Sequence, residues 1–131
     1  MCIEENLQSV DLVRLCDSLV GVLGAMVHSG EILLLACRSV SNLLEALPAS
    51  ARLLERAGCI APLVQQLTSV EFVDVGELAV SALNKLSLLC APALLNAGVV
   101  DALLAFIDFF SEDTQRAALQ CLRNMALSAP M

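Results

Sequence analysis

The 131-residue sequence contains no tryptophan, no tyrosine and only four phenylalanines. It also lacks Asn-Gly and Asp-Gly hairpin turns, and no stretch alternates steadily between apolar and polar residues, so β-sheet signals are weak. The apolar residues, 58% of the chain, are mainly leucine, alanine and valine, which are typical of packed helices. We therefore expect an all-α protein.

Catalytic and metal-binding constellations are missing as well. His28 is the only histidine, and the sequence contains neither a phosphate-binding glycine-rich loop nor a His-Glu-x-x-His motif. The cysteines are at least 14 residues apart, which argues against a local zinc or redox site and favours buried, reduced thiols. They are Cys2, Cys16, Cys37, Cys59, Cys90 and Cys121. The prediction is a chain without enzymatic activity, metal or cofactor.

Basic residues are scarce, at seven against fourteen acidic ones, which gives a formal net charge of −7. Because phosphate backbones repel such a chain, we expect no nucleic-acid partner, and a basic peptide or protein face suits the charge better. The longest uncharged stretch, residues 86–100, is shorter than the about 20 residues that span a membrane. The acidic start lacks the basic segment of a signal peptide. We therefore expect a cytoplasmic or nuclear protein without a membrane partner.

An internal repeat is the most informative feature that is present. Residues 57–67 (AGCIAPLVQQL) recur 40 positions later as residues 97–107 (AGVVDALLAFI). Each block has a glycine near its start, continues with apolar residues at helical spacing and leads into a longer helical pattern. A period near 40 residues is that of armadillo and HEAT solenoids. We predict an armadillo-type, right-handed helical solenoid of about three repeats.

The helices that we expect follow the order short, medium, long, with breaks at Pro48, Gly58 and Gly98 and N-caps at Ser9 and Ser111. Their predicted ranges are 11–27, 32–47, 50–57, 60–67, 75–89, 92–97, 100–109 and 114–127. We predict one domain over residues 1–131, with a partial repeat at 1–47 and repeats at 48–89 and 90–131. Neither end carries a polar capping repeat, so we expect a piece of a longer array or self-association through the exposed ends.

The third helix of each unit would line the groove of an armadillo stack. Aligning Val40, Leu83 and Leu122 as core positions brings one polar i, i+4 pair from each unit into register. The candidate binding residues are Arg38, Asn42, Ser81, Lys85, Gln120 and Asn124, flanked by Glu45 and Arg123. We predict that this ladder hydrogen-bonds the backbone of an extended peptide. The alternative is that the six residues are only the polar edges of amphipathic helices.

Several short strings carry a resemblance to a known family between about residues 31 and 126. They are LLACR (34–38), EALP (45–48), DV (74–75) with AL (82–83), and FFS (109–111) with QR (115–116) and AL (118–119). In this series the sequence resembles the armadillo segment of the ubiquitin-fusion-degradation (thyroid-receptor-interacting / Kaktus) class of HECT-type E3 ubiquitin ligases. General armadillo proteins share the helix pattern but not these strings.

The resemblance implies a non-catalytic recognition segment that binds a substrate, a degron or ubiquitin. The catalytic HECT domain of the family lies at the far C-terminus, and nothing in this sequence matches it, so none of the cysteines inherits its role. A structural spacer or a generic armadillo scaffold is the alternative. Import adaptors, which hold basic peptides with paired Trp and Asn, are a weaker match. Asn42 and Asn124 stand at the Asn positions, but Lys85 replaces the middle one and no tryptophan is present.

Overall fold

The computed structural model describes residues 9–25, 29–69 and 71–128, and the regular structure within these ranges is entirely helical. The helices are α2 (Ser9–Gly24), α3 (Gly30–Ala46), α4 (Ser50–Ala57), α5 (Ile60–Leu67), α6 (Val73–Leu86), α7 (Ala91–Asn96), α8 (Val99–Phe106) and α9 (Glu112–Ser128), with the short 3₁₀ helix η1 (Ile107–Phe109) between the last two. The prediction of an all-α fold is confirmed. None of these helices is both long enough and apolar enough to cross a membrane.

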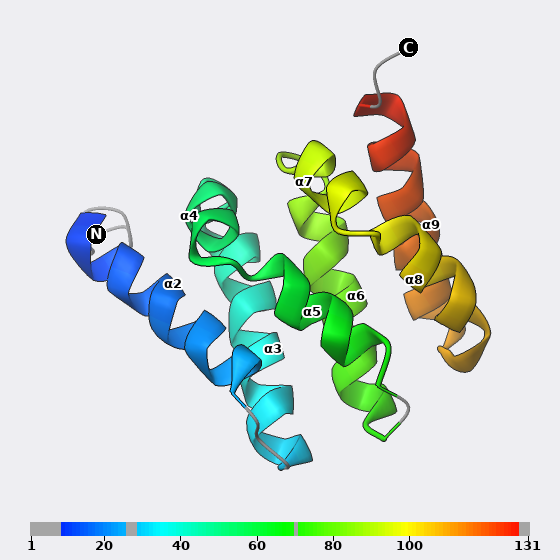
Figure 1. The fold of residues 1–131 in the computed structure, drawn as a ribbon, viewed down its shortest axis with the longest axis horizontal. Helices are drawn as coiled ribbons and strands as arrows, with labels where there is room; N and C mark the ends of the chain where they lie inside the picture. Colours follow the sequence, from blue (N-terminus) through cyan, green and yellow to red (C-terminus); the bar gives the residue numbers. More distant parts are fainter. Residues whose placement is uncertain (1–8, 26–28, 70, 129–131) are drawn as a thin grey trace.

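The helices stack in two layers, as Figure 1 shows. One layer contains α2, α5 and α8, and the other contains α3, α6 and α9, while α4 and α7 lie along one edge of the stack, at the top of Figure 1. Within the second layer α6 contacts both α3 and α9, and within the first layer α5 contacts both α2 and α8. Two successive triplets, α4–α6 and α7–α9, thus repeat the order short, medium, long after the pair α2 and α3. This translational repeat confirms the predicted solenoid.

Glycine corners and side-chain caps set the local turns. Gly58 and Gly98 have φ angles of +89° and +77°, a left-handed conformation that glycine adopts without steric cost. As predicted, Ser111 caps α9, with its hydroxyl accepting from the backbone N–H of Thr114 at 3.4 Å. Ser29 caps α3 in the same way, at 3.4 Å from the nitrogen of Ile32. Ser9, the other predicted N-cap, is the first residue of α2. Its side chain lies outside the described part of the structure.

Three predicted helix ends are wrong. The first helix was predicted to reach residue 27, but α2 ends at Gly24 and Ala25 lies in a bend. The pattern predicted a helix over residues 75–89, but α6 runs from Val73 to Leu86, and the chain then turns so that Cys90 is buried against the carbonyl oxygen of Ala51. The helix predicted over residues 100–109 is α-helical only to Phe106 and tightens into η1. By contrast, the ranges predicted for α4 and α5 are confirmed. Residues 26–28, which include His28, lie outside the described part of the chain.

One continuous apolar core fills the space between the layers and between the triplets. Its largest fully buried side chains include Leu23, Leu54, Leu63, Leu67, Leu83, Leu86, Leu94, Leu103 and Met125. Burying each such side chain contributes about 1.5–3 kcal/mol relative to leaving it in water. Because α6 lies in the middle of its layer, the core residues of this helix serve the contacts with both neighbours.

The cysteines among the described residues are free thiols buried in this core, which agrees with the prediction of buried, reduced thiols. Cys2 lies outside the described part. Burial raises the pKa of Cys37 and of Cys59 to about 12. A thiol with so high a pKa stays protonated at neutral pH and is a poor nucleophile. These cysteines therefore act as small apolar core residues.

Candidate interaction surface on α3, α6 and α9

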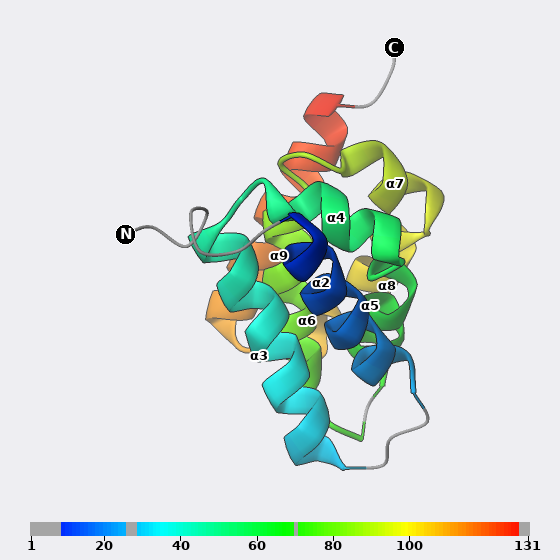
Figure 2. The ribbon, with the colours of Figure 1, turned by 90° about the vertical axis from the view of Figure 1, so that its left-hand side faces the viewer.

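The long helices α3, α6 and α9 follow one another along the stack and run in the same direction across it, with their C-terminal ends at the top of Figure 1 (see also Figure 2). Their buried sides face α2, α5 and α8, and their opposite sides face away from that layer. We call this outward surface the third-helix face. Each predicted polar pair lies on one of these helices, so the structure brings the six predicted residues to one layer.

The six predicted residues differ in how much solvent they meet. Arg38, Asn42 and Gln120 are exposed, whereas Ser81, Lys85 and Asn124 are half-buried. This division matters because a half-buried polar group in a helix layer usually serves its neighbours, while an exposed one is available to a ligand. The contacts of each residue decide which case applies.

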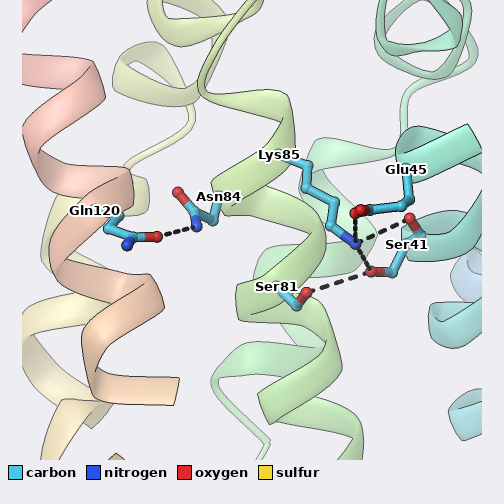
Figure 3. Close-up of polar contacts among 6 residues, drawn as sticks. All are labelled: Ser41, Glu45, Ser81, Asn84, Lys85 and Gln120. Atoms are coloured by element: carbon cyan, nitrogen blue, oxygen red, sulfur yellow. Dashed lines mark hydrogen bonds and ion pairs between the residues drawn. The ribbon is translucent and has the colours of Figure 1, made fainter. Parts of the chain in front are cut away.

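Lys85 and Ser81 connect α6 to α3 (Figure 3). The ammonium Nζ of Lys85 donates to the hydroxyl of Ser41 at 2.7 Å and to its carbonyl oxygen at 3.2 Å, and it forms an ion pair with Glu45 at 3.1 Å. The hydroxyls of Ser81 and Ser41 lie 3.3 Å apart. The donors of Lys85 are therefore occupied within the fold, and this lysine contributes first to the contact between neighbouring repeats.

Gln120 and Asn124 connect α9 to the same central helix. The amide of Asn84 donates to the side-chain oxygen of Gln120 at 3.0 Å, as Figure 3 shows. The amide of Asn124 donates to the hydroxyl of Ser87 at 3.0 Å, and Ser87 is buried. Four of the six predicted residues thus take part in a polar seam between repeats. The spacing predicted their helical phase but not these partners.

Ser41, Asn84 and Ser87 are the members of this polar seam that the sequence interpretation missed. Ser41 and Ser87 are 5% and 1% exposed, so each hydroxyl would be costly to leave without a partner. Ser41 directly follows the core residue Val40, and this phase turns its side chain toward the neighbouring helix. The signal available in the sequence was a serine directly after a predicted core position.

Arg38, Asn42 and Arg123 remain exposed on the third-helix face. Among the described residues, the ion pairs are Lys85–Glu45 and those of Arg116 with Glu112 and Asp113, so neither Arg38 nor Arg123 takes part in one. Arg38 lies one turn before Asn42 and Arg123 one residue before Asn124. These exposed donors can reach a bound ligand without breaking a contact of the fold.

An apolar cavity of about 380 Å³ opens at the C-terminal ends of α3 and α6. It is lined by Leu44, Glu45, Pro48, Lys85, Leu88 and Leu89. Leu88 lies in the turn that follows α6 and is 72% exposed. The ion pair of Lys85 with Glu45 forms the polar part of the wall, so the cavity can take an apolar side chain beside a charged one.

A second cavity of about 470 Å³ lies at the N-terminal ends of the same two helices. Its lining residues include Phe72 and the acidic residues Glu31, Glu71 and Asp74. A Cβ atom on Gly30 would lie 2.8 Å from the ring of Phe72, which explains why the start of α3 carries glycine. Among the described residues, no group of three or more His, Cys, Asp or Glu side chains is placed to hold a metal ion.

Comparison with known proteins decides the family. Residues 1–93 match the family described as "E3 ubiquitin-protein ligase TRIP12-like, TPR repeats". The chain belongs to this family. Residues 89–127 also match the armadillo/beta-catenin-like repeat. The resemblance to this class of ubiquitin ligases, inferred from the sequence, is confirmed.

Three curated relatives are E3 ubiquitin-protein ligases. The chain is 37% identical over 122 residues to UPL4 and 38% identical over 117 residues to UPL3, both of Arabidopsis thaliana, which covers 93% and 87% of the chain. It is 33% identical over 125 residues to TRIP12 of Danio rerio, which covers 95% of the chain. The chain spans only 6–8% of the length of these relatives. No solved structure matches it significantly.

The repeat type of this family segment follows from the geometry. A TPR unit is a helix pair of 34 residues, whereas armadillo units are near 40–47 residues and contain two or three helices. Here the corner glycines Gly58 and Gly98 are 40 residues apart, and each begins an equivalent medium helix followed by a long one. The triplets α4–α6 and α7–α9 therefore have the armadillo form.

Proposed function

We propose that this chain is a non-catalytic protein-interaction module of a HECT-type E3 ubiquitin ligase and that it binds a substrate segment or ubiquitin on the third-helix face. The single observation that carries the proposal is the set of exposed, uncommitted donors of Arg38 and Asn42 on α3 and of Arg123 on α9, two helices that the polar seam joins through α6. Family membership supports the ligase context. The transferase activity would belong to the whole protein.

The structure supports an interaction role through its rigidity. Lys85 joins α3 to α6, and Asn124 joins α6 to α9, so the exposed donors are held on a fixed surface. A fixed surface loses little conformational entropy when it binds a ligand. We also propose a cytoplasmic or nuclear location, which the protonated, buried thiols favour.

Binding to ubiquitin and to a candidate substrate segment tests the proposal. The purified chain should bind one of them in calorimetry, and the double substitution Arg38→Ala with Asn42→Ala should weaken that binding about tenfold or more, because exposed interface residues each contribute up to a few kcal/mol. Arg14→Ala on α2 is the matched control, since Arg14 is exposed and lies in the other layer. Binding that the double substitution leaves unchanged would place the site elsewhere.

The structural spacer is the second candidate, and the polar seam favours it, because most of the predicted ladder serves contacts between repeats. A spacer requires only the integrity of the stack. In that case no substitution on the third-helix face would alter the binding of any partner, whereas Leu83→Ala would still destabilise the fold by about 2–5 kcal/mol. The two candidates therefore give opposite results for the exposed residues.

A further inference from the structure

Charge is distributed unevenly along the third-helix face. The carboxylates of Glu31, Asp74, Glu112 and Asp113 lie in the first turns of α3, α6 and α9, where they complement the helix dipoles. Glu77 is engaged by the backbone N–H of Ser111. The remainder of these helices carries the cations Arg38, Lys85, Arg116 and Arg123 and one carboxylate, Glu45. Of these, Arg116 is paired with Glu112 and Asp113, and Lys85 with Glu45.

Beyond the first turns of α3, α6 and α9, the described part of the third-helix face has two cations without an ion pair, Arg38 and Arg123, whereas the carboxylates of Glu45 and Glu77 are both engaged. Arg38 lies seven residues after Glu31, which is about 10 Å along the helix axis and about one Debye length at physiological salt. A ligand at Arg38 and Arg123 therefore meets these guanidinium groups at close range, while most of the chain's carboxylates are screened. Guanidinium groups bind carboxylates with two parallel hydrogen bonds. The overall charge of −7 predicted a basic partner, but the surface favours an acidic one.

The spacing of the helices fixes the length of such a ligand. Neighbouring packed helices lie about 8–10 Å apart, so α3 and α9 are separated by about 20 Å across α6. An extended chain covers this distance with about six residues, at about 3.3–3.6 Å each. The apolar cavity at Leu44, Leu88 and Leu89 opens between the C-terminal ends of α3 and α6, and Leu44 lies six residues, or about 9 Å, beyond Arg38 along α3.

We infer that the third-helix face binds an extended acidic protein segment, with carboxylates about six residues apart at Arg38 and Arg123 and an apolar side chain in the cavity at Leu44, Leu88 and Leu89. This inference rests on the proposed function and names the chemistry of the partner. The amide of Asn42, which is exposed beside Arg38, can hydrogen-bond the backbone of the segment. Lys85 keeps its ion pair with Glu45 and forms one wall of the cavity.

Two synthetic peptides of about seven residues test the inference. One has glutamate at both ends and leucine in the middle, and the other has lysine at both ends and the same leucine. Fluorescence anisotropy with the 131-residue chain should show binding of the glutamate peptide and at least tenfold weaker binding of the lysine peptide. Added salt should weaken the binding of the glutamate peptide, because both contacts are exposed ion pairs.

Charge reversal provides the decisive variants. Arg38→Glu with Arg123→Glu should weaken binding of the glutamate peptide about tenfold or more and should strengthen binding of the lysine peptide. Arg14→Glu, the same change at an exposed residue of α2, should alter neither affinity more than about twofold, since the two layers face opposite ways. Leu88→Ser should weaken binding of the glutamate peptide, but the chain should still bind the glutamate peptide more tightly than the lysine peptide. Circular dichroism of each variant checks that the helices are retained.

The outcomes separate this inference from the proposed function. If the lysine peptide binds as tightly as the glutamate peptide, or if the reversed chain binds the glutamate peptide unchanged, an acidic partner is excluded. If ubiquitin or a substrate segment then still binds and loses affinity with Arg38→Ala and Asn42→Ala, the proposed function stands without the acidic chemistry. If neither the peptides nor the proteins bind, both proposals fail.

Discussion

At the scale of single residues, Glu77 on α6 stabilises the start of a different helix, α9. Its carboxylate accepts a hydrogen bond from the backbone N–H of Ser111, the residue that caps α9, at 2.7 Å. Burial raises the pKa of Glu77, but the hydrogen bonds from Ser111 and Thr114 outweigh it, and the net shift is downward. Glu77 in its ionised form therefore holds the start of α9, the long helix of the next triplet.

We predict that Glu77→Gln destabilises the chain by roughly 1 kcal/mol at neutral pH, since a hydrogen bond to a charged acceptor becomes a weaker neutral one. The folded-state pKa lies below the unfolded value of about 4.3, so the stabilisation is present above that value and is lost as the pH falls through the folded-state pKa. Urea unfolding at neutral and acid pH measures both effects. Asp17→Asn, the same charge change on the exposed side of α2, should have little effect at either pH.

The sequence predicted the phase of polar residues better than their partners. Arg38, Ser81 and Gln120 lie on the long helices as the spacing required, because helical phase depends only on positions within one helix. The reach of Lys85 to Ser41 depends instead on the distance and stagger between α3 and α6, which core packing sets. No pattern within a single helix contains that information.

At the scale of helices, Gly58 and Gly98 make the same corner, and α4 and α5 on either side of the first one have the predicted bounds. Where glycine and proline mark the turn, the sequence determines the end of a helix. The end of α6 has neither a glycine nor a proline. The apolar residues Leu88 and Leu89 continue its helical spacing of apolar residues, but both lie in the turn after the helix, and Leu88 is exposed there. The burial of Cys90 against α4, a tertiary contact, overrides the local pattern there.

A pair of glycine substitutions tests whether the corner is a requirement of the backbone. A Cβ atom at Gly98 would have no heavy atom within 4 Å, so its cost arises from the φ of +77° alone. Gly98→Ala should destabilise the chain by about 1–2 kcal/mol. Gly21 also has open space around its Cβ position but lies within α2, so Gly21→Ala should stabilise the chain by about 0.5–1 kcal/mol. Thermal unfolding that gives both changes the same sign would refute this explanation of the corner.

At the scale of the whole molecule, the two ends of the stack are unlike and both apolar. Val10 on α2 is 69% exposed, and at the other end Leu104, Phe109 and Leu119 are 58%, 62% and 58% exposed. In a helical solenoid, each repeat buries the apolar side of its neighbour, and a terminal repeat stays soluble when its outer side is polar. The exposed leucines and phenylalanine of α8, η1 and α9 are those that a further repeat would cover.

Because the two ends differ, association of one end with the opposite end of another copy is heterologous and does not close into a dimer. We predict that the isolated 131-residue chain forms species whose mass rises with concentration, as sedimentation velocity would show. Leu119→Glu should shift the chain toward the monomer, since it places a charge where the neighbouring stack would bury it. Leu88→Glu makes the same change at a residue that is 72% exposed but away from the ends, and it should leave the distribution unchanged. A chain that is monomeric at every concentration would show that these apolar ends tolerate water without a partner repeat.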